Sequence, residues 1–185
     1  MKIGVLALQG DFREHTLVLA DAGATPVEVR TVEQLSEVDA LVIPGGESTA
    51  IGRLARLYGL VEPIRERAAS GMPMLGTCAG MIVMASRVIG GEPLLSLVDV
   101  AIRRNAYGRQ VDSFETDVAV EGLGEVRGVF IRAPWVEDFG ADVRVLAEHE
   151  GRPVVLEQGN LVVAAFHPEL AGDPRLHEYV IGKAS

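Results

Sequence analysis

The stretch Pro73–Met81, "PMLGTCAGM", joins a short apolar run to the start of a helical pattern and contains the only cysteine of the 185 residues. Gly76 and Gly80 lie two positions on either side of Cys78. Small residues at these positions are what a sharp strand-to-helix turn requires, because bulky neighbours would clash there. The thiol would then lie at a helix N-terminus, where the dipole favours a thiolate. Taken alone, a single free cysteine is more often an inert buried hydrophobe.

The first half of the chain repeats this strand-to-helix alternation. Strands are expected over residues 2–8, 26–30, 39–46 and 73–76, and helices over residues 12–23, 32–38, 48–71 with an interruption near Gly59, and 79–90. Such alternation predicts a parallel sheet with helices on both faces.

The second half is strand-like with few helices. Strands are expected over residues 98–104, 109–120, 125–134 and 143–150, followed by a hairpin over 152–166 with its turn at Gln158-Gly159-Asn160, and a last helix over 174–183. Because no repeat, linker or low-complexity tract interrupts the chain, we expect one α/β domain over residues 1–185. It would contain a single open, mostly parallel sheet with helices on both faces and a β-rich C-terminal half.

Composition excludes several classes of function. The chain has 26 acidic and 17 basic residues and a formal charge of −9, which argues against a nucleic-acid partner and against a polybasic membrane anchor. No apolar run approaches the roughly 18 residues that cross a bilayer. One cysteine allows no internal disulfide and fits a reducing cytoplasm, and with scattered histidines it provides no metal-ligand cluster.

Residues 166–170, "FHPEL", follow the predicted strand LVVAA. Residues two apart in an extended segment point to the same side, and Pro168 restrains itself and the residue before it. His167 and Glu169 are therefore expected to face one spot, with the carboxylate orienting the ring as in a catalytic triad. A surface histidine beside a solvated acid is the alternative. The other histidines lack such an acid and are expected to be structural or solvated: His15, His149 and His177.

Residues 44–49, "PGGEST", end another predicted strand and begin a helix. Adjacent glycines let backbone N–H groups turn toward a ligand, and Ser48 or Thr49 can cap the helix. We expect the N–H groups of Gly46 and Ala79 to form an oxyanion hole, in which one donor is typically worth about 10²–10³ in rate. A plain turn is the alternative.

These three features all follow predicted strands. In an open α/β sheet, ligands bind beyond the carboxyl ends of the strands. The nucleophile, the oriented base and the oxyanion loop are therefore expected in one crevice, which favours a catalytic Cys78 over an inert one.

At these residues the chain resembles the class I (triad) glutamine amidotransferases and, within them, the glutaminase subunits of pyridoxal 5′-phosphate synthase. The similarity runs along nearly the whole chain, through the strings GVLALQGDFREH, LVIPGGEST, GTCAGMI, RRNAYGRQVDSFE, GVFIRAP and FHPEL. Other triad amidotransferases commonly have glutamine at the second position after the last glycine of the elbow, where this chain has Ile82. That difference favours the pyridoxal phosphate branch.

The resemblance implies site residues, a reaction and a partner. The catalytic residues would be Cys78, His167 and Glu169, and the contacts to L-glutamine would be Gly46, Glu47, Ser48, Arg104, Ile131 and Arg132. L-glutamine would be hydrolysed to glutamate and ammonia through a glutamyl thioester, without cofactor or metal. The synthase subunit would receive the ammonia. The family also implies low activity before docking, for which a flip of the Gly45-Gly46 peptide would be a physical cause.

Three alternatives remain open. A triad glutaminase could serve another synthase, although Ile82 and RRNAYGRQ weigh against it. A redox-sensing or chaperone-like α/β protein could use the elbow cysteine without needing FHPEL. A glutamine-binding module would not require a strained thiol.

Overall fold

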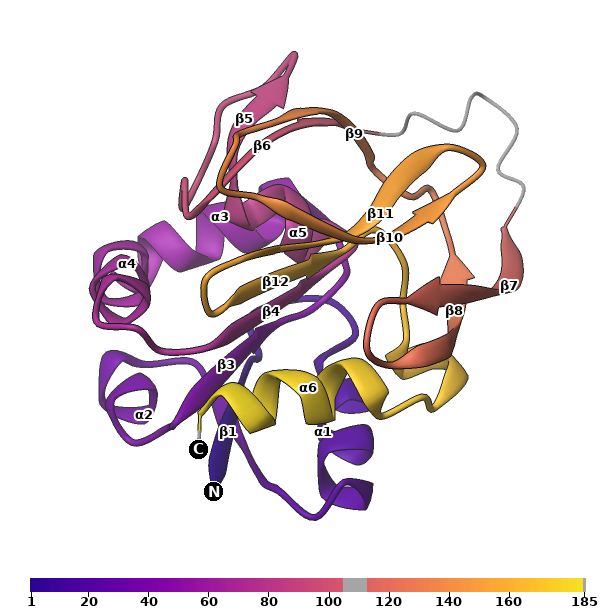
Figure 1. The fold of residues 1–185 in the computed structure, drawn as a ribbon. Helices are drawn as coiled ribbons and strands as arrows, with labels where there is room; N and C mark the ends of the chain where they lie inside the picture. The colour runs from indigo at the N-terminus through magenta and orange to yellow at the C-terminus, as the bar shows by residue number, and fades with distance from the viewer. Residues whose placement is uncertain (105–112, 185) are drawn as a thin grey trace.

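The computed structural model describes residues 1–104 and 113–184. The string RRNAYGRQVDSFE and the expected strand 109–120 therefore lie partly outside the described residues. The described residues form a main sheet of seven strands in the order β10-β11-β12-β4-β3-β1-β2 (Figure 1). Its parallel strands are β1 (Lys2–Leu6), β2 (Thr25–Val29), β3 (Ala40–Ile43), β4 (Met74–Thr77) and β12 (Leu161–Ala164). The antiparallel strands β10 (Arg144–His149) and β11 (Arg152–Gln158) extend one edge.

Helices cover both faces of this sheet, as the alternation predicts. On one face α1 packs beside α6, and on the other α3 packs against α5, with α4 in contact with α2 (Figure 1). Their bounds are α1 (Phe12–Asp21), α2 (Val32–Ser36), α3 (Ser48–Leu57), α4 (Val61–Ala69), α5 (Ala79–Met84) and α6 (Arg175–Lys183). All residues of β3 and β4 are buried, which is why these strands read as continuous apolar runs rather than alternating ones.

The later half forms two further small sheets. One contains β5 (Ala85–Ile89), β6 (Val98–Arg103) and β9 (Trp135–Phe139), and the other pairs β7 (Phe114–Val120) with β8 (Gly124–Phe130). The prediction of a β-rich second half is confirmed, as is the hairpin, in which Gln158 pairs with Leu161. The strand β9 was not predicted.

The expected helix over residues 79–90 is wrong in its second part, because the helix ends at Met84 and the chain continues as β5. The guanidinium of Arg87 lies 3.2 Å from the carboxylate of Asp99 in β6 and 2.9 Å from that of Asp138 in β9. These contacts between distant segments favour the extended form, and they are not visible in the local pattern of MIVMASRVIG.

The parallel strands point their carboxyl ends toward one edge of the sheet. Residues that follow β1, β3, β4 and β12 therefore meet there, and all three motifs of the sequence follow one of these strands. Within the described ranges, no helix has the length and apolar character needed to cross a membrane.

Candidate active site

Cys78 lies at the turn between β4 and α5, with φ 48° and ψ −104°. A positive φ is uncommon for a residue with a side chain and marks a strained backbone. The turn explains the small residues around it: a Cβ on Gly80 would lie 2.0 Å from the carbonyl oxygen of Ile43, and one on Gly76 would lie 2.6 Å from the sulfur of Met84. The predicted elbow is therefore confirmed, and Cys78 as a residue is 7% exposed.

His167 and Glu169 face each other as predicted. Nδ1 of His167 lies 2.7 Å from Oε1 of Glu169, and both side chains are buried. The backbone of His167 is paired with that of Val129 in β8, with the His167 N–H donating at 2.8 Å. Glu169 begins the short 3-10 helix η1 (Glu169–Ala171) after Pro168, so its carboxylate turns back under the imidazole.

The charges around His167 favour its protonated form. Burial lowers the pKa of His167, but hydrogen bonds and charge from Cys78 and Glu169 outweigh this effect and raise that pKa from 6.5 to about 10. Burial raises the pKa of Glu169, and the interaction with His167 opposes this increase. The imidazole thus lies between the thiol and the carboxylate, which is the order nucleophile, base and orienting acid.

A cavity of about 630 Å³ opens at this edge of the sheet. Cys78 and His167 face it, whereas Glu169 lies behind His167 and does not line it. The cavity brings together the other residues expected at the site: Gly46, Glu47, Ser48, Ala79, Arg104, Ile131 and Arg132. These residues, together with Cys78 and His167, follow the ends of five strands: β3, β4, β6, β8 and β12.

Arg104 and Arg132 differ in how much of their charge is already engaged. One Arg104 nitrogen lies 3.4 Å from Oε1 of Glu47 and 3.2 Å from the hydroxyl of Thr49. Arg132 has φ 46° and, within the part of the chain that the structure describes, no ion pair. Arg132 therefore offers the more available positive charge to a carboxylate in the cavity.

The Glu47 side chain is occupied by the protein itself. Its carboxylate accepts hydrogen bonds from the N–H groups of Thr49 at 3.0 Å and Ala50 at 2.7 Å, and so caps α3. Burial raises the pKa of Glu47, but these backbone hydrogen bonds outweigh burial and lower it. Glu47 thus fixes the start of α3 and orients Arg104, and its backbone is the part left for a ligand.

Sequence reasoning missed Gln9 and Asp11, which follow β1 and line the cavity. Oε1 of Gln9 accepts from the N–H of Glu47 at 2.6 Å, and the N–H of Asp11 donates to the carbonyl oxygen of Gly45 at 3.0 Å. These two contacts hold the glycine loop on both sides of Gly46. The sequence could have indicated them, because both residues come directly after a predicted buried strand, where residues of the site are expected.

Asp11 also lies near the triad. Its Oδ2 is 3.5 Å from Nδ1 of His167. Burial raises the pKa of Asp11, with a smaller opposing effect of His167. Ligand atoms of Asp11, His167 and Glu169 lie within 4.8 Å of one another, so these groups have the donor types of a metal site, but Oε1 of Glu169 is already bound to His167.

The remaining histidines lie away from the cavity. His15 and His177 are buried beneath the triad, with 0% and 1% exposure. His149 is half-buried, with its ring centroid 5.5 Å from those of Phe114 and Phe130. Their expected assignment as structural or solvated is consistent with these positions.

Comparison with known proteins agrees with this geometry. A model of the SNO glutamine amidotransferase family matches residues 5–185. The chain belongs to this family. The amidotransferase is 55% identical to the pyridoxal 5′-phosphate synthase subunit PdxT of Acidothermus cellulolyticus, over 97% of this chain and 92% of that protein. It is 56% identical to the PdxT subunit of Streptomyces avermitilis, over 95% of this chain and 90% of that protein.

Solved structures show the same fold for this amidotransferase. A crystal structure of a glutamine amidotransferase superposes with a TM-score of 0.95 at 49% identity and covers 98% of both chains. The structure of PurLQS from Thermotoga maritima has a TM-score of 0.74 at 17% identity, covering 100% of this chain and 98% of that one, which shows a shared fold alone. The predicted class I amidotransferase fold is confirmed.

Proposed function

We propose that residues 1–185 form one glutaminase domain in which Cys78, His167 and Glu169 hydrolyse L-glutamine, and that the ammonia passes to the synthase subunit of pyridoxal 5′-phosphate synthase. The PdxT relatives, 54–56% identical over nearly the whole chain, support this reaction and this partner. The observation that carries the proposal is the cavity lined by Cys78 and His167, with Glu169 2.7 Å behind the imidazole. A reducing cytoplasm, which keeps a single thiol free, is the proposed location.

The proposed reaction begins when His167 accepts the proton of the Cys78 thiol. The Cys78 thiolate attacks the side-chain amide carbon of glutamine, and the N–H groups of Gly46 and Ala79 bind the oxyanion. His167 then donates its proton to the leaving ammonia, which leaves a glutamyl thioester on Cys78. Water attacks the thioester with His167 as base, and glutamate is released. Glu169 orients the ring and stabilises its protonated form throughout.

The substrate is proposed to bind along the wall opposite the triad. The guanidinium of Arg132 suits the α-carboxylate, because an arginine fork pairs with two carboxylate oxygens. Arg104, held by Glu47 and Thr49, is the second candidate. Gly46, Glu47, Ser48 and Ile131 would supply backbone contacts from the same cavity.

Dependence on the partner has a physical candidate in the glycine loop. A flip of the Gly45-Gly46 peptide would break the hydrogen bond from the Asp11 N–H to the Gly45 carbonyl oxygen. We propose that docking of the synthase subunit compensates for this loss. An isolated chain that hydrolyses glutamine as fast as the complex would contradict this proposal.

The direct test measures glutamate released from glutamine by wild type and Cys78→Ser, each alone and with the synthase subunit. Release that rises with the synthase and disappears in Cys78→Ser is expected. His167→Asn should also abolish release, with His149→Asn as the matched control, since His149 lies outside the cavity. If folded wild type releases no glutamate in the presence of the synthase subunit, the proposal is wrong, and a redox role for Cys78 would be left.

A further inference from the structure

A group of buried polar side chains lies beneath the triad and takes no part in the proposed reaction. His15 in α1 is completely buried and contacts three other elements. Its Nε2 lies 3.0 Å from Oγ1 of Thr77 and 3.5 Å from Oε1 of Glu169. Its Nδ1 lies 2.7 Å from Nε2 of His177 in α6. One ring therefore joins β4, η1 and α6.

Two of these contacts are with residues that support the catalytic groups. Thr77 is the last residue of β4 and directly precedes Cys78. Glu169 holds the ring of His167. His15 thus contacts the residue that precedes the nucleophile Cys78, and it contacts the carboxylate that orients the base His167.

Both rings of the pair are neutral at neutral pH. The titratable groups that face His15 are Glu169 from η1, His177 from α6 and His167 after β12. Burial, followed by repulsion from His177 and His167, lowers the pKa of His15 well below 6.5. Burial lowers the pKa of His177 to about 4. Each ring therefore carries one hydrogen.

The 2.7 Å contact between the rings requires one hydrogen between Nδ1 of His15 and Nε2 of His177. The other nitrogen of His177, Nδ1, has no hydrogen-bond partner among the described residues. Whichever ring donates, Nε2 of His15 stays paired with the Thr77 hydroxyl, because a hydroxyl can both donate and accept.

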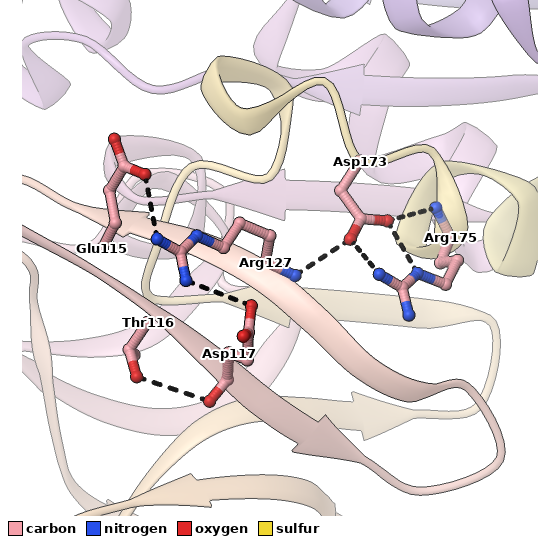
Figure 2. A network of polar contacts seen from close by, with 6 residues as sticks. All are labelled: Glu115, Thr116, Asp117, Arg127, Asp173 and Arg175. Atoms are coloured by element: carbon pink, nitrogen blue, oxygen red, sulfur yellow. Dashed lines mark hydrogen bonds and ion pairs between the residues drawn. The ribbon is translucent and has the colours of Figure 1, made fainter.

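A second polar network, in which Asp173 meets Arg127 and Arg175, anchors the start of α6, the helix that contains His177 (Figure 2). The buried carboxylate of Asp173 accepts from the backbone N–H of Arg127 in β8 at 2.9 Å. It also accepts from the backbone N–H of Arg175 at 3.1 Å and from its guanidinium at 2.9 Å and 2.5 Å. Asp173 thus ties α6 to β8 and sets where His177 meets His15.

We propose that His15 is a positioning residue for the glutaminase reaction, which fixes Cys78 through the Thr77 hydroxyl and packs against the Glu169 carboxylate that orients His167. Apolar side chains would fill this layer without the cost of burying polar groups, so a polar set that meets the triad is expected to serve it. The inference rests on the proposed function of the triad.

The test compares His15→Phe with His177→Phe. Both remove a buried histidine from the same layer, but of the two only His15 contacts Thr77 and Glu169. Glutamine hydrolysis is measured with the synthase subunit, and alkylation of Cys78 by iodoacetamide is measured on the free chain as a function of pH. His15→Phe is expected to lower kcat by about 10²-fold, as small displacements of reacting groups do, with KM nearly unchanged.

His15→Phe should also shift the pH profile of alkylation, and it should lower kcat by more than His177→Phe does, since only His15 contacts Thr77 and Glu169 directly. His15→Gln, which keeps a polar atom within reach of Thr77, should restore part of the activity. Equal losses in the two phenylalanine variants, or a lower Tm with an unchanged alkylation profile, would show a merely structural role and overturn the inference.

A double-mutant cycle covers the case in which His15→Phe does not fold. Thr77→Val removes the hydroxyl without changing the shape, and Thr77→Ser keeps it. Thr77→Val should lower kcat and Thr77→Ser should not, and the losses from His15→Gln and Thr77→Val should not add. Additive losses would contradict the contact. The reference is glutamate release by wild type and its loss in Cys78→Ser. If the proposed function is wrong, this comparison fails, whatever the His15 and Thr77 variants show.

Discussion

The two sides of Glu169 hold buried histidines whose pKa values are shifted in opposite directions. On the cavity side His167 has a pKa raised to about 10, and on the other side His177 has one lowered to about 4 and His15 one lowered well below 6.5. Burial lowers the pKa of all three. The difference comes from partners, since His167 contacts the thiol of Cys78 and the Glu169 carboxylate at 2.7 Å, whereas His15 lies 3.5 Å from that carboxylate and 2.7 Å from the ring of His177. Contact with both the Cys78 thiol and the Glu169 carboxylate therefore decides which histidine is charged.

Removing the carboxylate shared by both sides should have the largest effect. Glu169→Gln deprives His167 of its orienting and charge-stabilising partner, so kcat for glutamine hydrolysis should fall by about 10³–10⁴-fold, as in other triads. Glutamate release with the synthase subunit is the measurement. Glu66→Gln, an exposed residue of α4, is the control and should match wild type. Loss of less than about tenfold would show that His167 does not depend on Glu169.

The neutral side can be tested through stability in acid. The pKa of His177 is about 4 when folded and 6.5 in an exposed histidine, so between these values the unfolded chain binds more protons. The free energy of unfolding should therefore fall as pH decreases from about 6.5 to about 4, with His177 contributing on the order of 3 kcal/mol. Urea unfolding of His177→Phe across this range should show a shallower pH dependence than wild type. An equal slope would mean that folding does not lower the pKa of His177.

The anchor of α6 should matter less. Asp173→Asn loses the charge that pairs with Arg175, and the free energy of unfolding should fall by about 1–3 kcal/mol. Chemical denaturation measures this change. Asp142→Asn, at an exposed position, is the matched control and is expected within about 0.5 kcal/mol of wild type. Equal stabilities of the two variants would refute the anchoring role.

The smallest change is a shift in titration on the cavity side. Cys78→Ala removes a hydrogen bond and a charge that raise the pKa of His167, so the midpoint of its ring signals in NMR should move down from the wild-type value near 10. The signals of His15 and His177 should not titrate near neutral pH in either protein. An unchanged midpoint for His167 would mean that Cys78 does not act on the imidazole.

Local patterns of the sequence predict the elbow and the parallel strands, because both depend on residues next to each other. The glycines around Cys78 and the buried run of β3 act within a few positions. The segment 85–89 was misassigned because an apolar run alone does not distinguish a helix from a strand. Its strand form depends on backbone pairing with β6, which is distant in the sequence, and Arg87 adds contacts with Asp99 and Asp138.

The same limit applies to the site. Each predicted site residue belongs to a motif at a strand end, and the cavity lining includes all of them except Glu169. Gln9 and Asp11 hold the glycine loop only because β1 pairs with β3 in the sheet. The contact of His15 with His177 joins residues 162 positions apart, so no spacing rule could have indicated it.

The central claim is a glutamyl thioester on Cys78, and interception of that thioester tests it most directly. Hydroxylamine attacks a γ-glutamyl thioester to give γ-glutamyl hydroxamate, so wild type with glutamine and the synthase subunit should form the hydroxamate and Cys78→Ser should form none. Equal hydroxamate from Cys78→Ser, or none from folded wild type in the complex, would contradict the account.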